Sequence, residues 1–194
     1  MAKRNPGHKR KLTKLGKLAV LFVCALLLVG GCLVFRGALH SLYPQRYDDF
    51  VETYTAEHGL EKSFVYAVIK CESSFNPNAV SNVGARGLMQ IMPETYRWLQ
   101  SKTGETNDDD TLFDPKTSIR YGCMMYEILL RQFSDERVAV CAYHAGMGNV
   151  EKWLRDPQYS DDGKTLKDIP FPSTAQYADR VMRVREIYQS LYHL

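Results

Sequence analysis

The apolar residues of this chain form one long run near its start and short, regularly spaced sets after it. Residues 18–35 read LAVLFVCALLLVGGCLVF and carry no charge over 18 residues. At about 1.5 Å per helical residue, this run can cross a bilayer core of about 30 Å when the flanking basic side chains reach the interfaces. We therefore expect a basic cytoplasmic segment over residues 1–17, a transmembrane anchor over 18–36 and a connector over 37–44.

Beyond residue 44, apolar positions recur every three or four residues, and no stretch alternates with the period of two that is typical of a strand. One face of the last set consists of Tyr177, Val181, Val184, Tyr188 and Leu191. Helices are expected over residues 45–57, 63–71, 93–102, 115–133, 135–143, 148–155 and 173–191. The pattern predicts an all-α domain of about seven helices over residues 45–194, without an internal repeat.

Capping residues and helix breakers set the expected boundaries of these helices. The expected N-caps are Ser63, Asp114, Ser173 and either Ser134 or Asp135. Loops are expected over residues 74–86, 103–113 and 156–172, and a short helical turn over Gly87–Met92.

The charged residues are distributed unevenly, so the net charge of the whole chain describes neither of its two parts. The net charge of +3 comes from 25 basic and 22 acidic residues. Residues 1–36 hold 8 basic residues and no acidic one, so residues 37–194 carry a net charge of −5. A basic cluster before an apolar span predicts a cytoplasmic N-terminus and an extracytoplasmic remainder. Because the larger part is acidic and the basic cluster adjoins a membrane span, no nucleic-acid partner is expected.

Two other interpretations of the N-terminal region also predict that the domain after it is exported. A cleaved secretory signal has a shorter apolar core followed by small residues at a cleavage site, whereas apolar residues resume here after Gly30-Gly31. The segment 29–32, VGGC, resembles a lipobox, in which Cys32 would be lipidated. The length and flanks of the apolar run favour the uncleaved anchor, with Cys32 as a small apolar residue within the span.

Three cysteines, Cys71, Cys123 and Cys141, lie outside the apolar run. An odd number cannot pair completely within one chain, so a Cys123–Cys141 bridge is an alternative to three small core residues. Apolar neighbours at helical spacing favour the core interpretation. The chain has no CxxC pair and no metal-ligand spacing, so neither a metal nor a cofactor is expected.

Glu72 interrupts a helix that is otherwise built for burial. The apolar residues around it are Val65, Ala67, Val68, Ile69 and Phe75. Apolar packing desolvates a carboxylate and raises its pKa toward neutrality, which allows the group to hold its proton as a general acid. Taken alone, the residue is better interpreted as a surface Glu at a helix end, which is much commoner.

Four motifs around Glu72 change this interpretation. They are ES at 72–73 with NAVS at 78–81, GARGLMQIMP at 84–93, AYHAGMGNV at 142–150 and IPFPSTAQY at 169–177. In this order and at these separations, the chain resembles the lytic transglycosylases that share a fold with goose-type lysozyme. The resemblance implies a lysozyme-like helical domain with a substrate groove.

The resemblance also implies an activity, which is cleavage of the β-1,4 bond between N-acetylmuramic acid and N-acetylglucosamine in peptidoglycan strands. One Glu protonates the glycosidic oxygen and then deprotonates the C6 hydroxyl of the muramic acid, which leaves a 1,6-anhydro end. Carried over, Glu72 takes both roles. A typical glycosidase uses two carboxyl groups, and the motifs contain one. Glu94 is expected to complement a helix dipole, and Asp108-Asp109-Asp110 to form a solvated loop or, alternatively, a calcium site.

The same resemblance assigns residues that bind substrate, namely Ser73, Ser81, Gly87, Met89, Gln90, Tyr143, His144 and Tyr177. Ser81 is expected to donate a hydrogen bond near Glu72 or the substrate's acetamido group, and Gly87 to let the backbone approach a sugar. Gln90 offers a donor and an acceptor to a sugar amide. Met89 and Tyr177 are also interpretable as core residues.

Three positions depart from the family pattern. His144 stands where Asn is usual, Met147 where Pro is usual and Ser173 where Glu is usual. Histidine brings a pKa of about 6.5 and a different shape to the groove. These departures keep open an inactive glycan-binding scaffold of an envelope assembly. A muramidase that admits water is a further alternative, because no local feature of the sequence excludes it.

Overall fold

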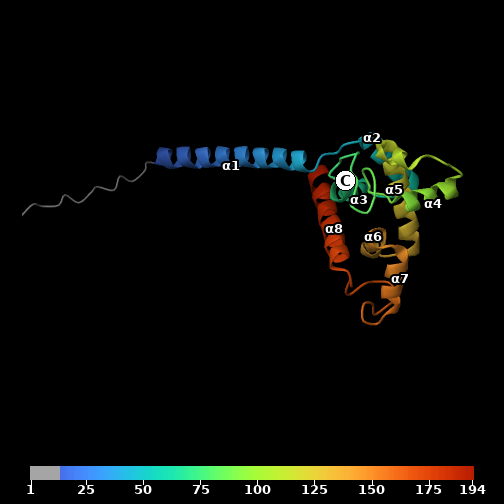
Figure 1. Cartoon of the computed structure of the whole chain (residues 1–194). Helices are drawn as coiled ribbons and strands as arrows, with labels where there is room; N and C mark the ends of the chain where they lie inside the picture. Colours follow the sequence, from blue (N-terminus) through green and yellow to red (C-terminus); the bar gives the residue numbers. More distant parts are fainter. Residues whose placement is uncertain (1–13) are drawn as a thin grey trace, which may run out of the picture. The chain divides into compact units, whose positions relative to one another are not determined.

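The computed structural model describes residues 14–194 and consists of two compact units, which divide between Pro44 and Gln45 (Figure 1). Within residues 14–194, the elements are helices and two isolated β-bridges, and there is no strand. The all-α class predicted from the sequence is confirmed. Most of the basic segment expected over residues 1–17 lies outside the described residues.

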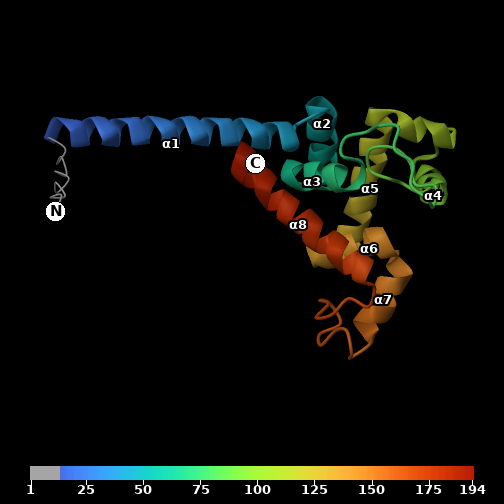
Figure 2. The same ribbon diagram turned by 60° about the vertical axis from the view of Figure 1, so that its left-hand side comes forward.

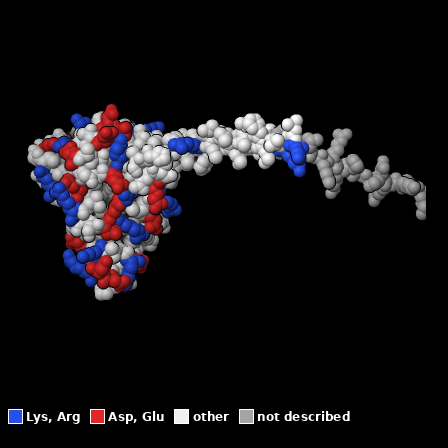
Figure 3. All heavy atoms as spheres, turned by 180° about the vertical axis from the view of Figure 1, so that it is seen from behind, with Lys and Arg blue, Asp and Glu red and all other residues white. Residues whose placement is uncertain are grey.

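The first unit contains one helix, α1 (Lys14–Leu42). Its stretch Leu21–Leu42 is long and apolar enough to cross a membrane. The side chains over residues 21–38 are exposed, and Figure 3 shows them as a mostly uncharged surface with Lys and Arg toward the ends. The helix continues through most of the segment expected to be a connector, because no proline interrupts it before Pro44.

Seven α-helices and one 3₁₀ helix make up the described second unit. They are α2 (Asp48–His58), α3 (Lys62–Ser73), α4 (Pro93–Thr103), η1 (Asp109–Phe113), α5 (Pro115–Gln132), α6 (Glu136–Ala145), α7 (Met147–Arg155) and α8 (Pro172–Tyr192). The predicted number of helices is confirmed, and their boundaries differ from the prediction by a few residues. Figures 1 and 2 show α4 and α7 at opposite ends of this unit.

The N-caps predicted from aspartates are confirmed. At the start of α5, Asp114 Oδ2 accepts a hydrogen bond from the backbone N–H of Thr117 at 2.9 Å. At the start of α6, Asp135 Oδ1 accepts one from the backbone N–H of Val138, also at 2.9 Å. Each bond satisfies one of the first N–H groups of a helix, which have no partner within the helix.

The N-caps predicted from serines are wrong. Helix α3 begins before Ser63, and Glu61 holds the cap position without a side-chain bond to the helix. Phe171 precedes α8, because Pro172 takes the first helical position and places Ser173 inside the first turn. Proline suits that position since its fixed φ is helical and its missing N–H would have no partner there.

The loop predicted over residues 74–86 is confirmed, but the short helical turn predicted over Gly87–Met92 is wrong. Residues 87–90 form a turn that an antiparallel bridge closes. The N–H of Arg86 donates to the carbonyl of Ile91 at 3.0 Å, and the N–H of Ile91 donates back at 3.1 Å. This bridge holds the start of α4 against the loop that follows α3.

The core lies where α3 packs against α8, and α6 packs against both α5 and α8. All the residues of α3 from Ser63 to Ile69 are buried, and the face predicted for α8 is buried as well. On α5, Leu129 is buried, whereas Leu130, which would also fit the helical spacing, is only partly buried. The expected surface loop over 103–113 contains η1, which buries Leu112.

Candidate active site

Glu72 lies half-buried in the last turn of α3. The helix ends there because Ser74 and Phe75 both adopt the left-handed conformation, with φ of 50° and 65°, and Phe75 is buried. Loss of solvation raises the pKa of Glu72 to about 7, while a hydrogen bond from Tyr177 and the charge of Arg180 act in the opposite direction. The predicted rise of this pKa is confirmed, and a large fraction of the carboxyl groups holds a proton at neutral pH.

Three tyrosines from three helices form a cluster next to this carboxyl group. The hydroxyl of Tyr177 on α8 donates to Glu72 Oε1 at 2.5 Å, and its oxygen lies 3.4 Å from the hydroxyl oxygen of Tyr126 on α5. The ring of Tyr126 stacks on that of Tyr143 from α6, with centroids 4.3 Å apart. Burial raises the pKa of all three hydroxyls, so they stay protonated and serve as donors.

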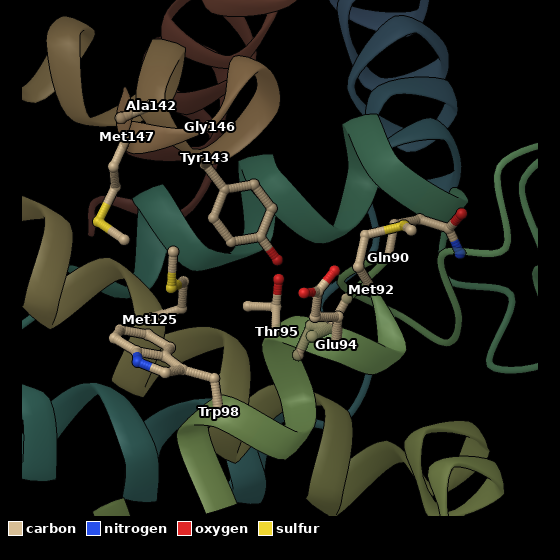
Figure 4. Close-up of a pocket in the computed structure, with 11 residues that line it drawn as sticks. Gln90, Met92, Glu94, Thr95, Trp98, Met125, Ala142, Tyr143, Gly146 and Met147 are labelled. Carbon is tan, nitrogen blue, oxygen red and sulfur yellow. The ribbon is translucent and has the colours of Figure 1, made fainter. Parts of the chain in front are cut away.

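A cavity of about 440 Å³ opens on the Tyr143 side of this cluster, between α4 and α6 (Figure 4). The hydroxyl of Tyr143 points into it and donates to the backbone carbonyl of Met89 at 2.6 Å. Thr95 and Trp98 line the cavity from α4, and Met125 lines it from α5. A hollow with apolar walls and a few polar groups is the usual form of a small-molecule site.

Two of the expected groove residues pack closely within the protein. A Cβ atom on Gly87 would lie 2.0 Å from the carbonyl oxygen of Leu112, so the backbone at Gly87 lies tightly against η1. Met89 is fully buried, and its sulfur fills the space left by the missing side chain of Gly122. Loop 84–91 packs closely on η1 and α5 at both positions, and the substrate contacts of Gly87 and Met89 remain predictions.

Gln90 does line the cavity. Its amide nitrogen donates to the backbone carbonyl of Ala79 at 3.1 Å and to that of Gly87 at 2.9 Å. Both N–H bonds therefore hold the loop together. The amide oxygen is the group that Gln90 can offer to a sugar, as an acceptor.

The two serines of the first motif make local hydrogen bonds. Ser73 Oγ donates to the backbone carbonyl of Ile69 at 3.2 Å, and Ser81 Oγ accepts the N–H of Ala85 at 3.0 Å. In the part of the chain that the structure describes, no hydrogen bond joins Ser81 to Glu72. The substrate contacts of both serines remain predictions.

His144 stacks on Tyr177, with ring centroids 4.6 Å apart, and its Nδ1 lies 3.0 Å from Thr174 Oγ1. Loss of solvation, and then the charge of Arg180, lower the pKa of His144 below its usual value. The ring is therefore neutral at pH 7. At position 144, where the family usually has Asn, a flat uncharged ring therefore lies against Tyr177, which contacts Glu72.

Two side chains near the site were missed at the sequence level. Arg180 lies three residues after Tyr177 on α8, and its guanidinium lies 5.8 Å from the centroid of that ring. Residues three apart share a helix face, so this spacing was a usable signal. Trp98 is partly exposed in the cavity wall, and Lys102 Nζ lies 4.4 Å from the centroid of its ring. Their spacing of four residues was a second usable signal.

The cysteines of the second unit are free thiols. Cys123 and Cys141 are buried, so the core interpretation is confirmed for them and the alternative of a bridge between them is wrong. Cys71 is half-buried, directly before Glu72 in the sequence. Burial raises the pKa of all three thiols, which keeps them protonated.

The acidic residues 108–110 bind protein groups. Asp108 caps η1 by accepting the N–H of Asp110 at 2.8 Å. Asp109 and Asp110 pair with Arg97 at 2.5 Å and with Arg86 at 2.6 Å. Within residues 14–194, no group of His, Cys, Asp and Glu side chains is placed to hold a metal ion.

Comparison with known proteins identifies the family. Residues 49–166 match the model of the Transglycosylase SLT domain. The chain belongs to this family. The soluble lytic murein transglycosylase of Escherichia coli K12 is 32% identical over 155 residues, which are 78% of this chain and 24% of the relative. The membrane-bound lytic murein transglycosylase C of Haemophilus ducreyi is 33% identical over 167 residues, which are 74% of this chain and 46% of the relative.

Solved structures give the same fold. An inactive Glu-to-Gln mutant of the lytic transglycosylase Slt from Pseudomonas aeruginosa superposes with a TM-score of 0.70 at 31% identity, covering 80% of this chain and 26% of that one. A complex of the 70-kDa soluble lytic transglycosylase with bulgecin A superposes with a TM-score of 0.71 at 29% identity, covering 79% and 26%. The predicted family and lysozyme-like fold class are confirmed. The chain spans about a quarter of the length of these soluble relatives.

Proposed function

We propose that residues 45–194 form a peptidoglycan lytic transglycosylase, which cleaves the bond between N-acetylmuramic acid and N-acetylglucosamine and leaves a 1,6-anhydro end. One observation carries this proposal. The carboxyl group of Glu72 has a pKa of about 7 and accepts a hydrogen bond from the buried Tyr177, in a tyrosine cluster whose member Tyr143 lines a cavity with largely apolar walls. The family's named relatives, lytic murein transglycosylases, support peptidoglycan strands as the substrate.

In the first step, Glu72 acts as a general acid. Its proton moves to the glycosidic oxygen while the bond from that oxygen to C1 of the muramic acid breaks. The hydroxyl of Tyr177 donates to the carboxylate that remains, and a hydrogen bond to an ionised acceptor is stronger than one to a neutral acceptor. Tyr177 therefore stabilises Glu72 more after proton transfer than before it.

In the second step, the same carboxylate acts as a base. It takes the proton of the C6 hydroxyl of the muramic acid, and the C6 oxygen attacks C1 to close the 1,6-anhydro ring. The proton returns to Glu72, and no water is consumed. The substrate's own acetamido group stabilises the positive charge at C1, as in other substrate-assisted glycosidases.

The surroundings of Glu72 support a scheme with one carboxylate. Glu94 is exposed in the cavity wall at the first turn of α4, where an acidic side chain complements the helix dipole. Asp109 and Asp110 are engaged in ion pairs with arginines. The solved Slt relative, which is inactive with one Glu replaced by Gln, is consistent with a single essential carboxyl group.

Digestion of purified peptidoglycan tests this function. The full-length chain in detergent micelles is incubated with the polymer, and the soluble fragments are weighed by mass spectrometry. We expect fragments with 1,6-anhydro ends, each lighter by one water than a hydrolysed end. Fragments with hydrolysed ends would identify a muramidase, and binding without fragments would identify a glycan-binding scaffold.

We also propose that α1 anchors the enzyme in the cell membrane as a single span, with residues 1–17 in the cytoplasm and residues 45–194 outside. The apolar stretch of α1, its exposed side chains and the basic residues before it support this orientation. Protease added outside cells whose wall has been removed should then degrade the second unit. Digestion only after membrane lysis would contradict the orientation.

Replacing Cys32 by serine should leave the protein in the membrane fraction with an unchanged apparent mass. Cys32 is one exposed residue within α1, and the apolar run around it supplies the membrane affinity. The measurement is membrane fractionation followed by immunoblotting, with Cys24→Ser as the matched control. If only Cys32→Ser releases the protein or changes its mass, Cys32 is a lipidation site instead.

The rate of cleavage should fall about tenfold for each pH unit above about 7, because only protonated Glu72 can start the reaction. Tyr177→Phe removes a hydrogen bond that favours the carboxylate, so the pKa of Glu72 rises and this alkaline limb moves to higher pH. The measurement is the pH profile of kcat/KM for both proteins. A limb that stays in place or moves to lower pH would contradict the assigned role of Tyr177.

A further inference from the structure

A positive charge stands beside Glu72 without a carboxylate partner. Arg180 is exposed on α8, and its charge lowers the pKa of Glu72, Cys71 and His144, so it faces all three side chains. Its guanidinium lies 5.8 Å from the centroid of the Tyr177 ring, and the hydroxyl of Tyr177 donates to Glu72. None of the ion pairs within the described residues includes Arg180.

Apart from Glu72, which is only partly ionised at neutral pH, the nearby groups do not neutralise this charge. The thiol of Cys71 stays protonated because burial raises its pKa, and His144 is neutral because its pKa is lowered. Asp179, the acidic neighbour in the sequence, pairs with Arg137 at 2.6 Å. Serine stands at position 173, in the first turn of α8, and adds no negative charge. Helix α8 therefore presents a positive charge near Glu72, although the second unit is acidic overall.

We infer that Arg180 binds a carboxylate of the substrate at the sugar next to the scissile bond, and so selects muramic acid residues with an anionic substituent. This inference rests on the proposed function. A guanidinium matches the geometry of a carboxylate and binds it through two parallel hydrogen bonds. Arg180 is a binding residue in this account, and Glu72 remains the catalytic residue.

Two sources can supply this carboxylate in peptidoglycan. Without a stem peptide, the lactyl group of the muramic acid ends in a free carboxylate. With a stem peptide, that carboxyl group is an amide, and the carboxylates lie farther away on the peptide. Oligomers of N-acetylglucosamine have the same β-1,4 linkage and no carboxylate, so they serve as the neutral probe.

The test measures binding of these three probes at equal length to the full-length chain in detergent micelles, with Glu72→Gln present throughout to prevent cleavage. Arg180→Gln is expected to weaken binding of a carboxylate-bearing probe about tenfold, as for the loss of one charge-assisted hydrogen bond, and to leave the neutral probe unchanged. If Arg180→Gln binds the peptide-free probe more weakly, Arg180 contacts the lactyl carboxylate. If it binds only the peptide-bearing probe more weakly, Arg180 contacts a carboxylate of the peptide. Arg180→Lys should restore only part of the affinity, because lysine keeps the positive charge but not the two parallel hydrogen bonds.

Lys152→Gln is the matched control, because Lys152 is exposed on α7 and its replacement makes the same change in net charge. It should leave all three affinities unchanged. Equal affinities of parent and Arg180→Gln for both anionic probes, or an equal loss for the neutral probe, would overturn the inference. Cleavage of peptidoglycan by the chain with intact Glu72 is measured separately, so failure of the proposed function is distinguishable from failure of this inference.

Discussion

Replacing Glu72 by glutamine is expected to lower the rate of peptidoglycan cleavage about a thousandfold or more. The substitution keeps the volume and a hydrogen-bond acceptor for Tyr177, but it removes the proton that the first step needs and the base that the second step needs. General acid–base catalysis contributes about 10²–10⁴-fold for one group. The measurement is the release of soluble fragments from peptidoglycan at pH 6, where most Glu72 carboxyl groups are protonated.

The control for this prediction is Glu186→Gln. Glu186 is exposed on the same helix as Tyr177, and the same chemical change there should leave the rate within about twofold. A Glu72→Gln variant that cleaves as fast as the parent would show that another group carries the proton.

The Glu72→Gln variant should also be at least as stable as the parent at pH 8. The pKa of Glu72 is raised in the folded protein, so its stabilising contribution is present at low pH and is lost as the pH rises through about 7. Above that pH the parent carries a poorly solvated carboxylate, which the amide avoids. Melting temperatures at pH 5 and pH 8 check that the lost activity is not lost folding.

Replacing Gly87 by alanine should lower the melting temperature of the second unit by roughly 10 °C. The new Cβ would lie 2.0 Å from the backbone oxygen of Leu112, and the φ of +76° is itself unfavourable for alanine. Overpacking costs about 1–3 kcal/mol and a left-handed residue about 1–2 kcal/mol. In a domain of this size, each kcal/mol shifts the melting temperature by roughly 2–4 °C.

Gly84→Ala separates these two causes. Gly84 also has a positive φ, of +89°, but its Cβ would meet nothing within 4 Å. The control therefore carries the conformational cost alone and should lower the melting temperature by only a few degrees. Equal shifts for the two variants would show that the contact of Gly87 with Leu112 is not a tight one.

Most of the fold and the raised pKa of Glu72 could be predicted from the sequence. Helical spacing located each α-helix of the second unit, because apolar faces at a period of 3.6 are what the helices bury. The position of Glu72 at the end of a buried helix predicted its raised pKa. The side chain of Tyr177 is buried and its hydroxyl donates to Glu72, so the core interpretation is confirmed and its contact with substrate remains a prediction.

Packing between segments that are distant in the sequence could not be predicted. Gly87 and Met89 belong to a motif with groove residues, but η1 and α5, which follow them in the chain, cover both positions. From periodicity alone, Arg180 is one of several charged residues on α8. Its position near Glu72 depends on the packing of α8 against α3, which periodicity cannot predict.

The most direct test of the one-carboxylate scheme is digestion of peptidoglycan in water enriched in heavy oxygen. If Glu72 deprotonates the C6 hydroxyl of the muramic acid, the new end closes on an oxygen that the substrate already contains. We expect every new end to be a 1,6-anhydro sugar without heavy oxygen. New ends that carry one heavy oxygen would show that water attacks C1, and would contradict the acid-then-base role of Glu72.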